Sequence, residues 1–230
     1  ETAEILSEEG NVSREKQEDF AIGSHEKALK AWENGHFNNE VVPIDLYGEN
    51  TVEQDEGPRQ PDLEKIKSLE PAFIEHGTIT AATSSPISIG ASAVLICSRD
   101  FAEKHDLKIR AIIKGRSVVG VDWKRMGEGP IPATEKVLQN TGMSMDEIDV
   151  IELNEAFAAQ SLYVIENGNW DRSRVNINGG AIALGHPLGC SGARIITTLV
   201  NVMEQENEKR GLATMCIGSG QGIATILGRD

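Results

Sequence analysis

Residues 148–166 read IDVIELNEAFAAQSLYVIE. The first six are mainly Ile, Val and Leu, which is typical of a buried strand, and residues 155–166 continue with the apolar spacing of a helix. Asn154 stands between the two, where the strand ends. In an α/β sheet, ligand-binding groups gather outside the carboxyl ends of the strands. This stretch therefore predicts an α/β fold and marks one edge of its sheet.

The alternation of strands and helices extends on both sides of this stretch. We expect strands at 109–121, 148–153, 175–177, 212–217 and 222–227, and helices at 133–140 and 189–206. Residues 109–121 are rich in Ile and Val, which predicts a buried strand. Gly218-Ser219-Gly220-Gln221 separates the last two strands and predicts an antiparallel hairpin, in a sheet that is otherwise mostly parallel.

The first hundred residues are less regular. Ser13 is a candidate N-cap for a helix that ends near Asn34. Three further expectations are a strand-like run at 41–44, a loop at 48–61, and a strand or buried helix at 91–97. The apolar content before residue 78 is low, so we expect this part to lie on another domain.

The composition is that of a globular protein and argues against several partners. The chain has 230 residues, of which 39% are hydrophobic, and a formal net charge of −14. This charge disfavours nucleic acid or anionic lipid as a partner. No apolar run is long enough to span a membrane, and the first residues do not resemble a signal peptide. Three cysteines are too few for a disulfide scaffold and fit a reducing, cytoplasm-like compartment.

The charge is unevenly distributed along the chain. Residues 1–75 carry 7 Lys and Arg against 19 Asp and Glu, whereas residues 101–125 carry 7 against 3. Two interpretations remain open: a solvated acidic face beside a neutral remainder, or a basic stretch that receives an anionic ligand.

Three polar clusters follow expected strands. In NEAF, at 154–157, the Asn154 amide could cap the next helix, or it could fix a water that donates to a developing oxyanion. In CIGSG, at 216–220, Cys216 is either a buried inert thiol or, with a lowered pKa, a group that takes and returns a proton. The alternate glycines after it leave backbone N–H groups available for an oxyanion.

The remaining cluster is GGAIALGHPLGCSG, at 179–192. Small residues let other backbone approach closely, and Pro187 stiffens the turn beside His186. The following helix points its N-terminus at this turn, and its dipole disfavours protonation, so His186 could act as a neutral donor to a carbonyl oxygen. A structural or solvent-facing histidine is the alternative.

Taken in order, these three clusters resemble the C-terminal signatures of the thiolase family. Shorter matches support the resemblance along the whole chain: TAE at 2–4, Asp55-Glu56 with Arg59, PAF at 71–73, GTITA at 77–81, and MG with GP at 126–130. Residues 184–195 and 212–222 are most similar to the degradative branch, particularly to β subunits of the bacterial fatty-acid oxidation complex.

The resemblance implies an α-β-α-β-α layered fold made of two similar halves, plus a loop domain over the coenzyme A site. By this similarity, residues 1–85 are part of the loop domain, residues 86–108 end the N-terminal half, and residues 109–230 form the C-terminal half. The segment with the acylated cysteine is then expected before Glu1, outside this chain.

The resemblance also assigns roles to individual residues. His186 activates the nucleophilic cysteine and donates to the thioester oxygen, Asn154 orients a water in the same oxyanion hole, and Cys216 is the acid/base. The Gly218 N–H contributes to a second oxyanion hole. Coenzyme A or acyl-CoA is implied as substrate, with no permanent cofactor and no metal, and three positions match contacts to it: Arg59 to CoA, Ser85 to pantetheine, and Met126 to the acyl pocket.

Three substitutions depart from the family pattern. Ala82 and Ile89 replace the usual Gly and Asp, and Pro86 replaces a small flexible residue, which puts pantetheine contacts of this stretch in doubt. Cys190-Ser191-Gly192 resembles the motif of the acylated cysteine but lies in the His186 element, so packing at the helix start is the better interpretation of Cys190.

The expected activity is acyl-CoA C-acyltransferase chemistry, in either the thiolytic or the condensing direction, by a ping-pong route. A homodimer or tetramer, and a fatty-acid oxidation α subunit, are the partners that the resemblance implies. Two alternatives are a non-catalytic fragment or partner subunit of a split thiolase, and a biosynthetic acetoacetyl-CoA thiolase.

Overall fold

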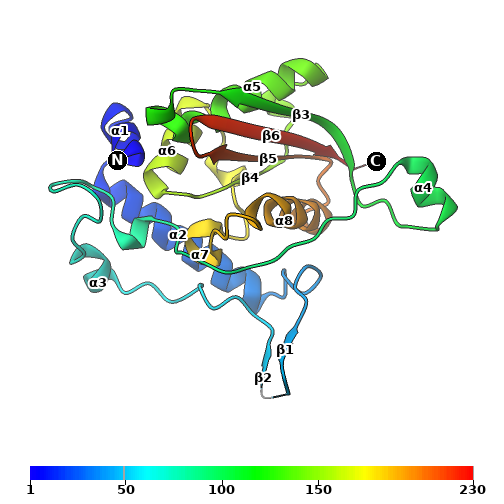
Figure 1. Cartoon of the computed structure of the whole chain (residues 1–230), viewed down its shortest axis with the longest axis horizontal. Coiled ribbons are helices and arrows are strands. Elements are labelled where there is room, and N and C mark those ends of the chain that lie inside the picture. Colours follow the sequence, from blue (N-terminus) through cyan, green and yellow to red (C-terminus); the bar gives the residue numbers. More distant parts are fainter. Residues whose placement is uncertain (49, 230) are drawn as a thin grey trace.

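A four-stranded sheet forms the centre of the computed structural model, which describes residues 1–48 and 50–229 (Figure 1). The strand order is β3-β6-β5-β4, with β3 at Ile112–Gly120, β4 at Val150–Leu153, β5 at Arg210–Ile217 and β6 at Gln221–Gly228. β4 and β5 pair in parallel, whereas β6 is antiparallel to both β5 and β3.

The expected closing hairpin is therefore confirmed, but the expectation of a mostly parallel sheet holds only in part. β3, β4 and β5 run in one direction, yet only one of the three neighbouring pairs is parallel. The reason is the hairpin itself, because its short turn returns β6 between β5 and β3.

Helices cover both faces of the sheet. α5 (Pro130–Thr141) and α6 (Ala158–Asn167) pack on one face, and α8 (Ser191–Gln205) packs on the other (Figure 1). Successive strand residues alternate between these layers: Ile151 and Leu212 belong to the core under α5 and α6, while Val150 and Ala213 pack against α8. This period of two is the geometry of a strand buried on both faces.

The expected strand at 175–177 is wrong. Only Val175 pairs, in an isolated parallel bridge to Ile151. The Asn176 side chain takes the place of a ladder, since its Oδ1 accepts from Leu153 N at 2.9 Å and its Nδ2 donates to Leu153 O at 2.8 Å. Asn176 also has a positive φ of 49°, which turns the chain away from the sheet.

The expected strand or buried helix at 91–97 is also wrong. The segment is extended without secondary structure, and Leu95 and Ile96 are 76% and 70% exposed. β3 is likewise less buried than expected, with Ile113 46% and Val118 51% exposed on its outer side. β3 is an edge strand that pairs only with β6, so one side of it lacks a neighbour in the described chain.

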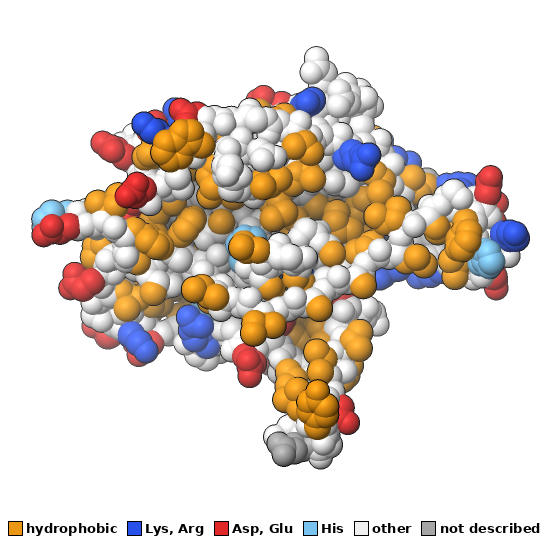
Figure 2. All heavy atoms as spheres, viewed as in Figure 1, with side chains coloured by type: hydrophobic (Ala, Val, Ile, Leu, Met, Phe, Trp, Pro, Cys, Tyr) orange, Lys and Arg blue, Asp and Glu red, His pale blue; other side chains and the backbone are white. Residues whose placement is uncertain are grey.

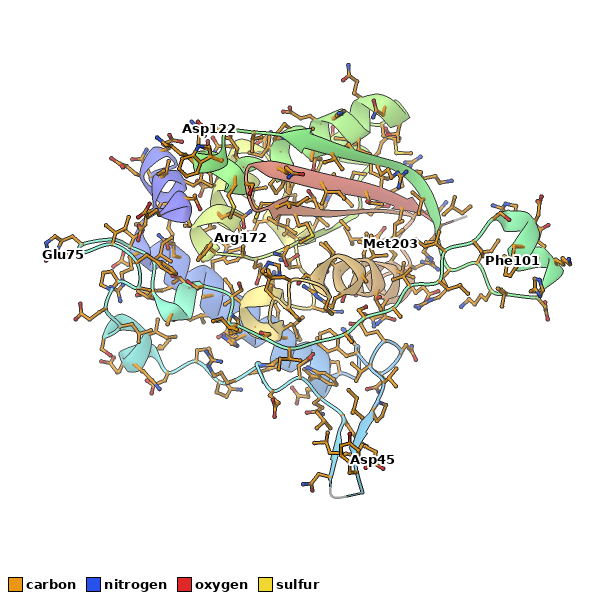
Figure 3. All side chains as sticks on the ribbon, in the orientation of Figure 1. Asp45, Glu75, Phe101, Asp122, Arg172 and Met203 are labelled. Carbon is orange, nitrogen blue, oxygen red and sulfur yellow. The ribbon has the colours of Figure 1, made fainter. Side chains whose placement is uncertain are left out.

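The first part of the chain wraps around this body. α1 (Thr2–Glu9) and α2 (Arg14–Glu33) come first, and Ser13 caps α2 as expected by accepting from Lys16 N. β1 (Ile44–Leu46) and β2 (Asn50–Val52) form a hairpin that projects from the body, so the expected loop at 48–61 is partly strand (Figures 1 and 3).

The remaining elements are short. They are α3 (Leu63–Lys67), α4 (Arg99–Lys104), α7 (Ala181–Leu184) and the 3-10 turns η1 (Ala81–Thr83), η2 (Trp123–Glu128), η3 (Met145–Glu147) and η4 (Arg172–Arg174). α4 forms a second projection, which carries Phe101 (Figure 3). No helix in 1–48 or 50–229 is long and apolar enough to cross a membrane.

Candidate active site

The parallel strands β4 and β5 bring two of the predicted site residues to one edge of the sheet. Leu153 pairs with Thr214, so Asn154 follows directly after β4 while Cys216 is the penultimate residue of β5. Neighbouring strands lie about 4.8 Å apart. The two polar clusters that follow these strands therefore meet at the carboxyl edge.

Asn154 is held rigidly and does not cap the next helix. It is fully buried, its N–H donates to Thr214 O at 3.0 Å, and α6 begins only after Phe157 without a side-chain cap. The Asn154 Nδ2 lies 3.4 Å from His186 Nε2. Its Oδ1 has no hydrogen-bond partner in the described residues, which is uncommon for a buried amide oxygen.

His186 lies in the turn between α7 and α8. Its Nδ1 is 2.6 Å from the Ser191 hydroxyl, which in turn donates to Pro187 O at 3.0 Å. Burial and the Arg194 charge lower the pKa of His186. The neutral ring expected from the sequence is therefore supported, but its causes are burial and Arg194 rather than a helix dipole alone.

Cys216 differs from the sequence expectation of a lowered pKa. Its side chain is only 6% exposed, and burial raises the pKa of the thiol to about 11. A thiolate in such surroundings loses its solvation, so the sulfur holds its proton at neutral pH.

The carboxylate of Glu155 anchors the turn that carries His186, and sequence reasoning missed it. It accepts from Ser24 Oγ at 2.7 Å, Asn176 Nδ2 at 2.8 Å and Ile182 N at 3.1 Å. A Cβ on Gly180 would lie 2.2 Å from this carboxyl carbon, so only glycine fits there. Glu155 directly follows Asn154 in the sequence, but nothing in this motif indicates a hydrogen-bond partner about 130 residues away.

A second buried charge cluster lies behind the site and was also missed. Arg194 of α8 approaches Glu152 of β4, with Nη1 and Oε2 3.6 Å apart. Burial raises the pKa of Glu152 to about 8 and that of Glu40 to about 7. Glu40 also accepts from Thr198 of α8 at 3.2 Å.

Residues 85–90 lie against the NEAF loop and the turn that carries His186. Ser85 N and Oγ both donate to Ala156 O at 3.1 Å, which ties this segment to the NEAF loop. Further along, a Cβ on Gly90 would lie 2.7 Å from the Pro187 ring. Ser85 is therefore beside the site, although its hydroxyl is used by the backbone.

The other predicted contacts are more dispersed. Arg59 is exposed and donates to Gly57 O at 3.1 Å, and Gly57 lies against the Ala183 carbonyl of α7. Met126 lies half-buried in η2, and Gly218 is exposed at the β5–β6 turn. None of the described contacts joins Arg59 or Met126 to His186.

Cys190 is buried at the start of α8, and burial raises the pKa of its thiol. Its sulfur would lie 3.6 Å from a Cβ on Gly90. These surroundings support a packing role.

Part of the basic stretch is paired, since Lys108, Arg110 and Arg125 form ion pairs with glutamates. Arg110 binds Glu204 at 2.6 Å, and Arg125 binds Glu9 and Glu128 at 3.0 and 2.8 Å. This favours the solvated-surface interpretation of the uneven charge. Within the described ranges, no group of three or more His, Cys, Asp or Glu side chains could hold a metal ion.

Comparison with known families agrees with this geometry. Residues 107–229 match the family described as thiolase, C-terminal domain, and residues 1–100 match the one described as thiolase, N-terminal domain. The chain is 51% identical to a 3-ketoacyl-CoA thiolase of Aliivibrio fischeri, over 99% of the chain and 61% of that relative. The chain thus spans about 60% of the length of the curated relatives it matches.

Two solved structures are similar over nearly the whole chain. One is human mitochondrial 3-ketoacyl-CoA thiolase in complex with CoA, with 40% identity, a TM-score of 0.94, and coverage of 100% of this chain and 58% of that one. The other is the Bacillus anthracis acetyl-CoA acetyltransferase, with 40% identity, a TM-score of 0.95, and coverage of 99% and 59%.

Proposed function

This chain belongs to the thiolase family, and from that premise we propose that its residues supply the acid/base and oxyanion groups of an acyl-CoA C-acyltransferase. The observation that carries the proposal is the contact between Asn154 and His186 at the sheet edge where Cys216 is the penultimate residue of β5. The acyl-accepting cysteine is proposed to lie outside these 230 residues.

In the cleavage direction, His186 takes the proton of that nucleophilic cysteine. The thiolate attacks the 3-keto carbon, the bond between C2 and C3 breaks, and its electron pair leaves as the enolate of acetyl-CoA. Cys216 gives its proton to this enolate. His186 and a water held by Asn154 stabilise the oxygen of the acetyl-CoA enolate, and the Gly218 N–H stabilises the oxygen on the attacked carbon in the second oxyanion hole.

The raised pKa of Cys216 supports this order of events. A thiol with a pKa of about 11 begins as S–H, which is the form that protonates an enolate. The thiolate left behind can then accept the proton of free CoA as CoA attacks the acyl-cysteine. The protonated resting state thus fits the degradative direction.

For coenzyme A, we propose contacts from Arg59, Ser85 and Met126. The Arg59 contact is supported by two observations. Its guanidinium is exposed and suited to a phosphate, and the nearby Gly57 touches α7. Ser85 adjoins the NEAF loop, where a pantetheine amide could reach it.

For the complete protein, we propose the branch of the fatty-acid oxidation β subunits, a homodimer or tetramer, an α-subunit partner and a cytoplasmic location. The likeness to an acetyl-CoA acetyltransferase keeps a biosynthetic thiolase as the second candidate. A partner subunit of a split thiolase is the third, since no described cysteine stands where a nucleophile is expected.

The test compares two proteins in thiolysis of acetoacetyl-CoA. One is the purified chain alone, and the other is a chimera in which the chain replaces the matched segment of the Aliivibrio fischeri relative. We expect turnover only from the chimera. An inactive chimera that is folded would contradict the proposal. Turnover by the chain alone that is lost in Cys190→Ser would show that the nucleophile is misassigned.

A further inference from the structure

Ser191 is the first residue of α8 and has no exposed surface. Its backbone N–H donates to Pro187 O at 2.9 Å, so the helix start and the proline turn are fixed to one another. Its hydroxyl lies between two groups of the same turn, the Pro187 carbonyl at 3.0 Å and the His186 Nδ1 at 2.6 Å.

A hydroxyl has one proton, and the two neighbours differ in what they can do with it. A backbone carbonyl can only accept, whereas a neutral imidazole nitrogen either donates or accepts. If the Ser191 proton goes to Pro187 O, the oxygen lone pairs face His186, and Nδ1 must carry the ring proton. His186 Nε2 is then the unprotonated nitrogen.

The other side of the ring agrees with this arrangement. Asn154 Nδ2 lies 3.4 Å from Nε2, and an amide N–H can donate only to a lone pair. In the opposite tautomer, Nε2 carries the ring proton, and the Ser191 hydroxyl must donate its hydrogen bond to Nδ1. The Asn154 amide must also turn so that its oxygen accepts from Nε2–H.

We propose that Ser191 is the positioning residue that selects the tautomer of His186, with the proton on Nδ1 and the lone pair of Nε2 presented to the site. The inference rests on the proposed role of His186 and extends it to a residue that acts through the ring. When Nε2 accepts a proton, the Nδ1–H bond to Ser191 remains in place, and only the Asn154 amide gives up its contact with Nε2.

The test reads the tautomer directly. The protein is labelled with ¹⁵N only in its 5 histidines and studied by solid-state NMR at a pH where His186 is neutral, which does not require a monomer. The His186→Gln spectrum identifies the His186 signals. We expect the ¹⁵N chemical shift of a protonated ring nitrogen for Nδ1 and that of an unprotonated one for Nε2. The reverse pattern in the wild-type chain would overturn the proposal without any variant.

Two variants then separate tautomer control from packing. Ser191→Ala should move the tautomer ratio by about tenfold toward Nε2–H, the effect of losing about one hydrogen bond. Ser191→Thr keeps a hydroxyl and should retain the wild-type ratio. The matched control is Ser117→Ala, because Ser117 is a buried serine on β3 that also donates to a backbone carbonyl.

In the chimera, Ser191→Ala should lower kcat in proportion to the fraction of Nδ1–H His186 that the spectra show to be lost, with little change in KM, since only the fraction of competent base falls. An unchanged ratio in Ser191→Ala would contradict the proposal even if the chimera is active. A chimera without thiolase activity but with Nδ1–H on His186 would instead sink the proposed function and leave the tautomer assignment standing.

Discussion

Residues 210–217 and 91–97 are two apolar segments of similar length, and each includes a cysteine at or near its end. β5, at Arg210–Ile217, lies between two strands and has helices on both faces, so Leu212 is fully buried. Residues 91–97 run as an extended segment in which Leu95 is 76% exposed. Apolar composition thus predicts burial only where the rest of the chain supplies a covering layer.

The first prediction measures that difference as stability. Leu212→Ala should lower the free energy of unfolding by about 2–5 kcal/mol, because it leaves a cavity among packed side chains. Leu95→Ala should change it by less than about 0.5 kcal/mol. Urea unfolding of both variants provides the measurement. Equal losses would mean that 91–97 is packed in solution and that the two regions do not differ.

The same comparison explains how much the sequence could reveal. Except at 175–177, the strands and helices of 130–228 follow their apolar periodicity because each has partners in the described chain. The predicted clusters at Asn154 and Cys216 also lie at one edge, since both follow parallel strands. The hydrogen bond between Ser24 and Glu155 could not be predicted, because no local pattern shows that a helix near the start bonds to a loop 131 residues later.

A second prediction concerns a contact within the first hundred residues, between α2 and the loop that follows β2. His25 of α2 accepts from Arg59 N, and burial together with the Arg59 charge lowers its pKa from 6.5 to about 4. In the unfolded chain, His25 therefore binds a proton below pH 6.5, whereas in the folded chain it binds one only below about pH 4. This group alone lowers stability as the pH falls across that window, by up to about 3 kcal/mol.

His25→Gln keeps an acceptor but does not titrate, so it should lose less stability than the wild type between pH 6.5 and 4. Glu40 and Glu152 act in the opposite sense in both proteins, because burial raises the pKa of each. The measurement is therefore the difference between variant and wild-type unfolding curves at each pH. His76→Asn, on an exposed turn with positive φ, is the control and should leave the slope unchanged. An identical slope in His25→Gln would refute the account.

The smallest expected effect on stability comes from changing the exposed surface itself. Apolar side chains gather along the 91–97 segment and β3 and across the face shown in Figure 2. We expect the isolated chain to self-associate or to bind a hydrophobic dye strongly. Leu95→Ser with Ile96→Ser should reduce dye binding while changing stability by less than about 0.5 kcal/mol.

Leu63→Ser, on the separate helix α3, is the matched control because Leu63 is 52% exposed but belongs to neither 91–97 nor β3. It should leave dye binding nearly unchanged. A monodisperse wild-type chain that melts cooperatively and binds no dye would count against an uncovered apolar face.

The most direct test of the proposed site asks whether His186 and Cys216 serve different steps. The Aliivibrio fischeri chimera and its variants are incubated with radiolabelled acetyl-CoA, covalent label is counted, and condensation is assayed separately. His186→Ala should slow labelling by at least about 10²–10³ through the lost oxyanion donor, and the lost base should add a further factor of about 10²–10⁴. Cys216→Ser should take up label almost normally yet lose condensation by at least about 10², since a serine hydroxyl is too weak an acid. If Cys216→Ser takes up no label, or still condenses near the parent rate, the assignment of Cys216 as the acid/base is wrong.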